Sequence, residues 1–570
     1  MKVSDYITRF LIEHEITDVF GYPGGMITYL MDSFDKHKSE LKSHVNYHEQ
    51  ASAFAACGYA QVSLKPGVAY TSSGPGATNL MTGIANAYFD SIPTIFITGQ
   101  VNTYEAKGTL PLRQKGFQEM DVVSLASSIT KYCVQVATAE DVRYHLEKAY
   151  YTSMNGRPGP VLLDIPMNIQ RADIDPEKLH GFEPDSAVVS TSAEDVQKEI
   201  YNALQNAKRP CILVGAGVRA SGTQHSLERW VNHLKIPVVS SMLAVDVLPN
   251  SPYYYQFVGA YGARHANFIL AKSDLIICLG SRMDLRQTGA NTDNFAINAK
   301  LIRIDIDDSE FSHKVKPDEK EFCINLKTLL PVLAEKNYLC DLNFSAWTTV
   351  CDEIKNKLDG KDNLEPNQIM ERLSKKIEKD VVITTDVGQN QVWTAQSFIP
   401  TGQRILFSGG HGAMGYSLPA AIGAHYALGQ KVVAFTGDGG LQMNIQELQF
   451  IARENLPILI ILLNNTSLGM IRHFQEMYFD SNYVHTKKEG GYTTPNFQAI
   501  AVAYQIPYYR LENDDDLNNW ETIRAHDGPV FLEIVLQDTT YVFPKLAMGK
   551  LNQDQDPELD RTLYEYLSKL

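Results

Sequence analysis

The stretch FTGDGGLQMNIQELQFIARENLPILIILLNNTSLGM, residues 435–470, decides both the fold and the chemistry that this sequence can support. It begins as the end of a buried strand that runs into a Gly-Asp-Gly turn. Residues with helical spacing follow, and then the apolar run LPILIILL leads into an Asn-Asn pair. Such a run is typical of a central parallel strand that is covered on both faces. We therefore expect Asp438 and Asn465 at the carboxyl ends of two parallel strands, where such sheets usually bind ligands.

Oxygen-bearing side chains at that edge suit a hard divalent cation, with Mg²⁺ as the candidate. Such an ion would bridge a diphosphate, whose other oxygens could lie on backbone N–H groups at a helix N-terminus. Glycines at 437, 439 and 440 would let the backbone come close to it. The alternative is a turn in which Asp438 only caps a helix. A bare Gly-Asp-Gly would favour that alternative, and the later Asn-Asn pair argues against it.

The length and the pattern of the chain indicate several α/β domains. With 570 residues, the chain is expected to hold about three or four domains. Short apolar runs alternate with longer helical patterns, which is typical of parallel sheets with crossover helices. We predict three doubly wound parallel-sheet domains over residues 1–170, 190–340 and 365–540, then a polar C-terminal tail, 541–570. Polar segments at 170–195 and 351–367 are interpreted as linkers.

Composition limits the partners and the compartment. The net charge of −15 argues against nucleic acid or an anionic membrane surface as a main partner. Seven scattered cysteines without a Cys-x-x-Cys motif are typical of reduced thiols in a cytoplasmic protein. The first twenty residues include acids that a targeting peptide would lack, and LPILIILL is too short to span a bilayer. We therefore expect a cytoplasmic protein.

The 435–470 stretch resembles the diphosphate- and metal-binding motif of thiamine-diphosphate (ThDP) enzymes. Residues 1 to about 545 are similar to the catalytic subunit of acetolactate synthase (acetohydroxyacid synthase). The similar stretches are FGYPGG, SGPGATN, GFQEMDVV, GRPGPVLLDIP, TDVGQNQVW, MGYSLPAAIGA and NNTSLGMIR. The resemblance implies the ThDP-binding fold, with pyrimidine-binding, middle and diphosphate-binding domains. It also implies Asp438, Asn465 and the backbone carbonyl of Ser467 as metal ligands.

ThDP chemistry needs a buried carboxyl group near ring nitrogen N1′ of the cofactor, and Glu49 is the candidate. The helix that follows Glu49 is small and apolar on nearly all faces, so we expect Glu49 to be buried. Burial favours the neutral form of a carboxyl group, which suits proton sharing. Without the resemblance, a solvated acid in a first helical turn would be the simpler interpretation.

The resemblance assigns further roles around the cofactor. Met414 would be the wedge that bends it, although a core methionine is the plainer interpretation, and the Gly412 carbonyl would receive its 4′-amino group. Gly388 and Gln389 are similar to residues that hold the diphosphate, and Phe117 and Gln118 to residues that line the active site.

The middle block contains LVGAGVRASG, a Gly-x-Gly turn after a strand, which alone is weak evidence for a nucleotide site. The stretches SSMLA and LGSRMDLRQTG resemble the FAD-binding pattern of acetolactate synthase. The implied FAD contacts are Arg157, Gly215, Gly217, Met242, Leu243, Arg282 and Asp305. The FAD would be structural, because the carboligation has no net redox step. A middle domain that keeps the fold without a flavin is the alternative.

The resemblance implies that pyruvate loses CO2 and that the remaining two-carbon unit passes to a carbonyl acceptor. The substrate candidates are Gly25, Arg286, Met470 and Phe474. Retained Arg286 favours a second pyruvate as the acceptor, giving 2-acetolactate. Met167, Phe474 and the long segment 103–115 depart from the family pattern. Met167 and the long segment favour a nucleotide-activated 4-keto sugar as the acceptor.

A non-catalytic ThDP-binding paralogue is a further alternative, but it would be expected to lose Glu49, Asp438 or Asn465, and all three are present. In this family the first block of one subunit faces the third block of its partner. The resemblance therefore implies a homodimer or homotetramer with active sites between subunits. The sequence does not determine whether a small regulatory subunit binds this chain.

Overall fold

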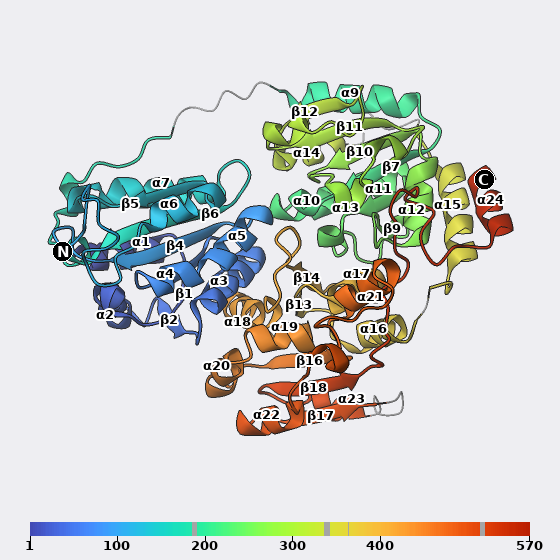
Figure 1. Cartoon of the computed structure of the whole chain (residues 1–570). Coiled ribbons are helices and arrows are strands. Elements are labelled where there is room, and N and C mark those ends of the chain that lie inside the picture. The colour runs from blue at the N-terminus through green and yellow to red at the C-terminus, as the bar shows by residue number, and fades with distance from the viewer. Residues whose placement is uncertain (185–190, 336–341, 363, 513–518) are drawn as a thin grey trace. The chain divides into compact units, whose positions relative to one another are not determined.

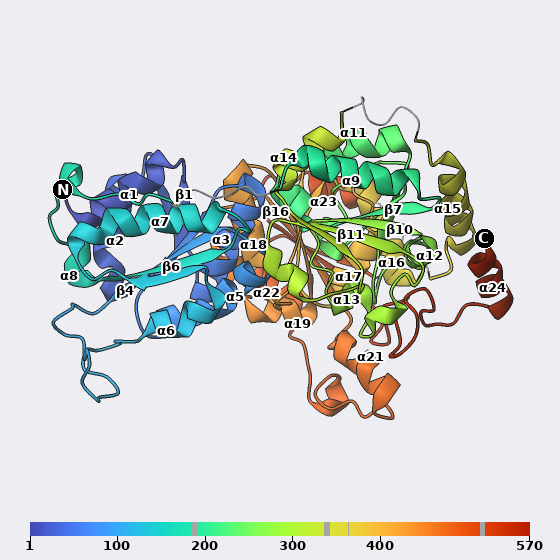
Figure 2. The ribbon, with the colours of Figure 1, turned by 90° about the horizontal axis from the view of Figure 1, so that it is seen from above.

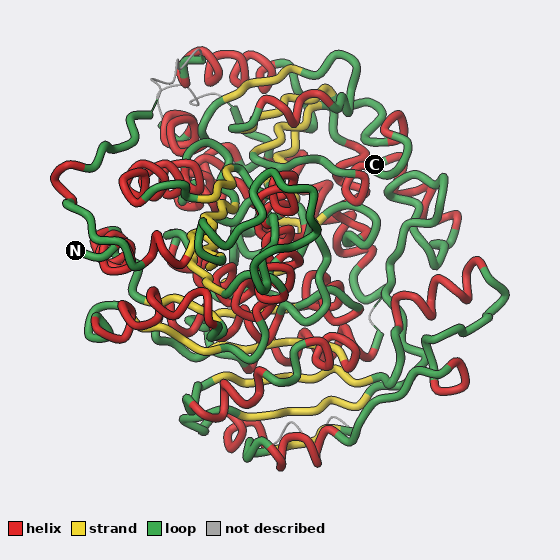
Figure 3. Tube along the Cα trace, turned by 60° about the vertical axis from the view of Figure 1, so that its left-hand side comes forward, coloured by secondary structure: helices red, strands yellow, loops and turns green. Residues whose placement is uncertain are grey.

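The computed structural model describes residues 1–184, 191–335, 342–362, 364–512 and 519–570. It contains three six-stranded sheets flanked by helices (Figures 1 and 3), and the strand pairings given below are parallel. This confirms the predicted fold class. The linker expected at 170–195 includes residues 185–190, which lie outside the described residues. By compactness the chain divides into one unit of residues 1–186, 381–390 and 406–539, and a second unit of the remaining residues.

The strand orders are those of doubly wound sheets, because chain neighbours are often separated in the sheet. The first sheet has the order β2-β1-β3-β4-β6-β5 and consists of β1 (Asp18–Gly21), β2 (Lys42–Val45), β3 (Gly67–Thr71), β4 (Thr94–Gln100), β5 (Tyr132–Gln135) and β6 (Pro160–Pro166). The second has the order β12-β11-β10-β7-β8-β9 and consists of β7 (Pro210–Val214), β8 (Val238–Ser240), β9 (Tyr254–Phe257), β10 (Leu275–Leu279), β11 (Lys300–Asp305) and β12 (Lys320–Cys323). The third has the order β14-β13-β15-β16-β18-β17 and consists of β13 (Val382–Thr385), β14 (Arg404–Phe407), β15 (Val432–Gly437), β16 (Ile458–Asn464), β17 (Tyr508–Leu511) and β18 (Val530–Val535).

The helices follow the strands as crossover connections. Those around the first sheet are α1 (Val3–Glu13), α2 (Thr28–Lys36), α3 (Glu49–Ser63), α4 (Pro75–Asn79), α5 (Met81–Phe89), α6 (Val122–Ala126), α7 (Val142–Met154) and α8 (Met167–Gln170). Those of the middle block are α9 (Ala193–Gln205), α10 (Ala216–Ala220), α11 (Gln224–Leu234), α12 (Arg264–Lys272), α13 (Leu285–Thr288), α14 (Leu326–Leu333) and α15 (Ser345–Leu358). The remainder are α16 (Glu365–Lys376), α17 (Gln389–Ser397), α18 (Ser417–Leu428), α19 (Asp438–Met443), α20 (Glu447–Arg453), α21 (Gly469–Tyr478), α22 (Phe497–Ala503), α23 (Trp520–Arg524) and α24 (Arg561–Lys569).

Helices bury the first sheet on both faces. Because successive residues of a strand point to opposite sides, the residues of one strand pack into two different cores. On β4, Ile95 and Ile97 pack into a core with α1 and α7, whereas Phe96 packs into a core with α3. Figures 1 and 2 show α1 and α7 on one face of this sheet and α3 on the other. Strands buried on both faces read as continuous apolar runs, which is why the sequence identifies them.

The core that contains α3 extends without interruption into the third sheet. It includes Ala55 and Phe54 of α3, Ala420 and Ile422 of α18, and Ile460 of β16. The two helices approach closely: a Cβ atom built on Gly58 would lie 2.2 Å from the Ala420 oxygen. The first and third blocks of one chain thus share a single core.

The second unit corrects one sequence interpretation. Residues 351–358 of the expected linker belong to α15, and residues 365–367 begin α16. Trp347, Cys351, Ile354 and Leu358 recur at helical spacing and are buried, so this face packs into the core of the unit. The many charged residues between them line the exposed face and hide this pattern in the sequence.

The segment after residue 540 also packs against the second unit. The Arg264 guanidinium donates to the backbone oxygens of Gln555 (2.9 Å) and Pro557 (2.7 Å), and Leu567 of α24 is fully buried. The C-terminal residues therefore form an integral layer of this unit.

We predict that Gly423→Ala destabilises the chain, because the new Cβ atom would lie 1.8 Å from the Ala55 oxygen, a backbone atom that cannot rotate away. The helices would have to separate, at a cost of about 1–3 kcal/mol or more. Thermal denaturation of the purified protein measures this as a lowered midpoint. Gly25→Ala is the matched control, since a Cβ atom there meets nothing within 4 Å, and an equal midpoint for both variants would contradict the prediction.

Candidate active site

The residues expected to bind a metal meet at the carboxyl ends of β15 and β16. These strands are parallel neighbours, with Gly437 paired to Leu463. Asp438 begins α19 directly after β15, and its carboxyl oxygens accept hydrogen bonds from the N–H groups of Gly439 (2.8 Å) and Ser467 (3.1 Å). The second of these bonds joins the two strand ends and brings Asp438 beside the loop of Asn465 and Ser467.

The environment of Asp438 fits a cation. The side chain is buried, and this burial raises the pKa of Asp438 to about 7, against the opposing effect of its two backbone donors. A divalent ion would stabilise the charged form. Among the described residues, no three histidine, cysteine, aspartate or glutamate side chains cluster as a metal site. An ion here would therefore combine the Asp438 carboxylate with the Asn465 amide oxygen and the Ser467 carbonyl.

Gly388 and Gln389 lie beside this loop, where β13 gives way to α17. The Gln389 amide oxygen accepts a hydrogen bond from Nδ2 of Asn465 at 2.8 Å. Gly469 leaves room for this side chain, since a Cβ atom at 469 would lie 1.9 Å from the Gln389 oxygen. The amide of Gln389 thus orients Asn465, and with it the amide oxygen that would face an ion.

Sequence reasoning missed Asp386, which follows β13 at the same sheet edge. Its buried carboxylate accepts hydrogen bonds from Gly415 N and Asn390 Nδ2, each at 3.0 Å, and from Thr436 Oγ1 at 3.2 Å. Burial raises the pKa of Asp386 to about 6. A Cβ atom on Gly440 would lie 2.2 Å from Asp386, so glycine is required there for packing. The strand-end position that identified Asp438 also applies to Asp386 and could have found it.

Met414 lies over the Gly-Asp-Gly turn, within a loop that precedes α18. Its Cε atom would be 3.0 Å from a Cβ atom on Gly439, and the Leu468 side chain and the Tyr492 hydroxyl lie near the same point. Gly412, in the same loop, has a left-handed φ of 68°. The structure thus places Met414 beside the loop of Asn465 and Ser467, the expected metal site, which we call the metal loop. It also adds Tyr492, which the sequence analysis did not identify.

Glu49 lies in the first-sheet half of this unit, as the first residue of α3. One carboxyl oxygen accepts a hydrogen bond from Asn79 Nδ2 at 2.9 Å, and the other would lie 3.3 Å from a Cβ atom on Gly76. Glu49 is half-buried in one chain, which is less burial than the residues after it led us to expect. Glu49 lies in the first turn of α3, beside the Gly-Pro-Gly turn at residues 74–76.

Gln118 and Phe117 differ in their surroundings. Gln118 has a left-handed φ of 61° and packs against Gly74 of the Gly-Pro-Gly turn, close to the elements that hold Glu49. The neighbouring Phe117 is 78% exposed and is not enclosed by its own chain.

Asn444 links the first block to the third block within one chain. Its Nδ2 atom lies 3.0 Å from the Gln50 amide oxygen and 2.9 Å from the Gly415 carbonyl oxygen. Gln50 follows Glu49, and Gly415 follows Met414. A single side chain thus fixes the start of α3 relative to the loop that carries Met414.

Comparisons with known proteins agree with this geometry. Three models of the thiamine pyrophosphate enzymes match the chain: the N-terminal TPP binding domain at residues 1–125, the central domain at 197–333 and the C-terminal TPP binding domain at 386–534. The acetolactate synthase large subunit of Lactococcus lactis is 35% identical, with 97% of this chain and 95% of that protein covered. The large subunit of acetolactate synthase isozyme 2 from Escherichia coli is 33% identical, with 97% and 99% covered. The chain belongs to the thiamine pyrophosphate enzyme family.

The expected substrate residues of this thiamine pyrophosphate family member belong to both units. Met470 and Phe474 lie on α21, which begins just after the metal loop, and Phe474 is 44% exposed and contacts the ring of Tyr478. Gly25 is exposed at the start of a short 3-10 helix in the same unit. Arg286 belongs to the second unit, where it is an exposed residue of α13.

The expected flavin residues lie mostly at strand ends of the second sheet. Gly215 and Gly217 follow β7, and a Cβ atom on Gly215 would lie 2.0 Å from the Gly280 oxygen, so the close approach of two backbones already requires glycine. Met242 and Leu243 lie on a 3-10 helix after β8, and the Arg282 guanidinium lies 3.7 Å from the Asp284 carboxylate. The Asp305 carboxylate accepts a hydrogen bond from the Asp307 backbone N–H. Arg157 belongs to the first unit, where its Nε donates to Ser91 Oγ at 2.8 Å.

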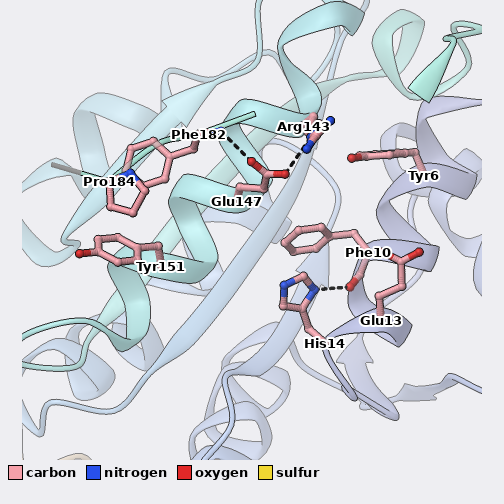
Figure 4. Close-up of a pocket in the computed structure, with 9 residues that line it drawn as sticks. All are labelled: Tyr6, Phe10, Glu13, His14, Arg143, Glu147, Tyr151, Phe182 and Pro184. Atoms are coloured by element: carbon pink, nitrogen blue, oxygen red, sulfur yellow. Dashed lines mark hydrogen bonds and ion pairs between the residues drawn. The ribbon is translucent and has the colours of Figure 1, made fainter. Parts of the chain in front are cut away.

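A separate pocket opens in the first unit between α1 and α7 (Figure 4), with a volume of about 470 Å³. Glu147 at its wall is already paired with Arg143 Nε (2.8 Å) and with Phe182 N (2.6 Å). Tyr6 and His14 complete the opposite wall. Because no predicted site residue lines this pocket, it is not part of the cofactor site.

No helix among the described residues combines the length and apolar character needed to cross a membrane.

We predict that Asp438→Asn weakens Mg²⁺-dependent ThDP binding by about two orders of magnitude, because a neutral amide would replace the carboxylate that we expect to bind the ion. Isothermal titration calorimetry with ThDP, in the presence of Mg²⁺ and after its removal by EDTA, measures the effect. Asp527→Asn, at an exposed aspartate just before β18, is the control. Unchanged affinity in Asp438→Asn would contradict the assignment.

Proposed function

We propose that this chain is a ThDP-dependent carboligase of the acetolactate synthase type, which joins two pyruvate molecules into 2-acetolactate and releases CO2. The observation that carries the proposal is the metal loop, in which Asp438 and Ser467 are hydrogen-bonded across adjacent strand ends. The names of the relatives, acetolactate synthase large subunits that align along almost the whole chain, support the same activity.

The residues of the site would divide the work of binding and proton transfer. Asp438, Asn465 and the Ser467 carbonyl would hold Mg²⁺, and Met414 beside Gly439 would support the bent form of the cofactor. ThDP, when bound, supplies a nucleophilic ring carbon and an electron sink for decarboxylation. Glu49 would share a proton with N1′ of the pyrimidine and thereby help to remove the proton from the reacting carbon.

In the overall reaction, the bond between C1 and C2 of one pyruvate breaks and CO2 leaves. The electron pair left on C2 forms a bond to the carbonyl carbon of the acceptor, and the acceptor oxygen gains a proton. With pyruvate as acceptor, two pyruvates are consumed for each CO2. With a nucleotide-activated 4-keto sugar as acceptor, one pyruvate is consumed for each CO2.

The acceptor has one structural argument on each side. Retained Arg286, together with the names of the relatives, favours pyruvate. The departure from the family pattern at 103–115 favours a bulkier acceptor, because this segment is exposed, with Leu110 and Leu112 about half accessible. The test supplies pyruvate, ThDP and Mg²⁺ with and without a nucleotide-linked 4-keto sugar, and measures pyruvate loss, CO2 and product mass. We expect 2-acetolactate and a ratio of two pyruvates per CO2, and absence of CO2 release would refute the carboligase.

We predict that Glu49→Gln leaves ThDP affinity within a few-fold of the wild type but slows exchange of the C2 proton of bound ThDP by about 10²–10⁴-fold. The amide keeps the shape of the side chain but cannot share its proton with N1′. Exchange is followed by quenching in acid and recording the NMR spectrum of the released cofactor. Glu105→Gln, at a partner of Asn102 in the same domain, is the control. Wild-type exchange in Glu49→Gln would refute the role of Glu49.

We also propose a structural FAD in the second unit and a homodimer as the smallest active assembly. The flavin is supported by the strand-end arrangement of Gly215, Gly217 and Arg282. A bound flavin predicts yellow absorbance of the purified protein, and denaturation should release the flavin.

The dimer is supported by the incomplete enclosure of Glu49 and Phe117 in one chain. Light scattering coupled to gel filtration gives the molar mass, and a monomer at working concentration would refute the dimer. The unpaired state of every described cysteine is compatible with the cytoplasm as its compartment.

A further inference from the structure

Glu447 is a buried acid that the mechanism above does not use. It is the first residue of α20 and is fully buried. Burial is also the main reason that its pKa rises to about 7. A carboxyl group in such a place is costly unless its oxygens are satisfied by specific donors.

The donors to Glu447 come from the segment that presents Glu49. One carboxyl oxygen accepts from Asn46 Nδ2 at 2.9 Å, and the other accepts from the Tyr47 backbone N–H at 2.8 Å. Asn46 and Tyr47 connect the end of β2 to the start of α3, three and two residues before Glu49, respectively. The carboxyl group of the third block therefore sets the course of the backbone that leads to Glu49.

The same turn holds the other side of Glu49. Asn444, three residues before Glu447, is hydrogen-bonded to the amide oxygen of Gln50 at 3.0 Å. Residues 444–447 follow directly after α19, whose first residue is Asp438. The segment from Asp438 to Glu447 thus connects the metal loop with contacts on both sides of Glu49 in the sequence.

We infer that Glu447 is a positioning residue, which sets the carboxyl group of Glu49 for proton sharing with the cofactor by anchoring Asn46 and the Tyr47 N–H. The inference rests on the proposed function, since it is Glu49 that it positions. The chemistry favours an acid at 447, because a carboxylate offers two acceptor oxygens to two donors, whereas an amide offers one.

A conservative substitution, Glu447→Gln, should keep the contact with Asn46. Its Oδ1 atom is buried and, among the described residues, has no hydrogen-bond partner. In Glu447→Gln, the new amide oxygen can accept from Tyr47 N–H, and the new NH2 group can donate to Oδ1 after the Asn46 amide flips. Glu447→Gln should therefore keep the anchor, whereas Glu447→Ala removes it.

A matched control separates positioning from general support between the two blocks. Tyr416 donates a hydrogen bond to Gln61 at 2.5 Å and so links the same two blocks, but at the other end of α3 from Glu49. Gln61→Ala removes this contact without touching the residues that anchor Glu49. If Glu447 only held the blocks together, Gln61→Ala and Glu447→Ala would behave alike.

The experiment has one readout without cofactor and one with it. In the cofactor-free protein, hydrogen exchange of the peptide that contains Tyr47 should be faster by about 10-fold or more in Glu447→Ala, and unchanged in Glu447→Gln and Gln61→Ala. At saturating ThDP and Mg²⁺, exchange of the C2 proton should be slower by about 10–100-fold in Glu447→Ala and within about 3-fold of the wild type in the other two.

Wild-type C2 exchange in Glu447→Ala, or equal slowing in Gln61→Ala, would overturn the inference. If Glu447→Ala does not fold, Asn46→Ala removes one of the two donors from the other side, and it must then slow C2 exchange while Gln61→Ala does not. Failure of the proposed function would look different, because the wild-type protein itself would release no CO2 from pyruvate. Slowed C2 exchange in Glu447→Ala would support the inference even then.

Discussion

The close crossing of α3 and α18 is the constraint on which the site depends. The backbones of the two helices approach so closely that glycine is required at 423, since a Cβ atom there would lie 1.8 Å from the Ala55 oxygen. This contact merges the helical layers of the first and third sheets into one core. Because α3 begins at Glu49 and the loop before α18 contains Met414, the same crossing also constrains where these two residues lie.

Three buried carboxyl groups, those of Asp386, Asp438 and Glu447, lie in the third block, and their contacts distinguish them. Asp386 accepts three hydrogen bonds from its own block and holds the loop of Gly415. Asp438 accepts two backbone hydrogen bonds, and its raised pKa leaves it suited to a cation. Glu447 accepts its hydrogen bonds from the other block. Buried acids with raised pKa values are typical of functional sites. The contacts of Asp386 are those of a supporting group, whereas Asp438 and Glu447 are the acids for which we propose metal binding and positioning.

Much of this arrangement could be predicted because it follows from strand ends. An apolar run that ends in Asp or Asn places that residue at the ligand edge of a parallel sheet, which correctly located Asp438 and Asn465. The same rule covers Asp386, but no distant partner residue marked it in the sequence. The proposed role of Glu447 could not be predicted in this way, because it depends on hydrogen bonds with residues about four hundred positions earlier in the chain.

The errors have an equally physical origin. The segment 351–367 reads as a polar linker because lysines and aspartates outnumber its apolar residues, yet Cys351, Ile354 and Leu358 lie on one buried face of a helix. The burial of Glu49 was inferred from the residues after it, whereas its exposure depends on what covers the first turn of α3. Local patterns report which face of an element is apolar, and they do not report how completely the neighbours cover its ends.

The exposure that remains around Glu49 bears on how such a site can work. A carboxyl group shares a proton effectively with a buried base only where water is excluded, because bulk water weakens the interaction between the two groups. Within one chain, Glu49 is half-buried and Phe117 is 78% exposed, so the walls beside the acid are incomplete. The exposed rings of Phe474 and Phe479, just beyond the metal loop, add apolar surface that water covers poorly. A second copy of the chain, placed over these residues, would remove that water and complete the enclosure. In the proposed homodimer, assembly and catalysis would be coupled, because the surroundings of Glu49 would lose their water only when a second copy covers these exposed residues.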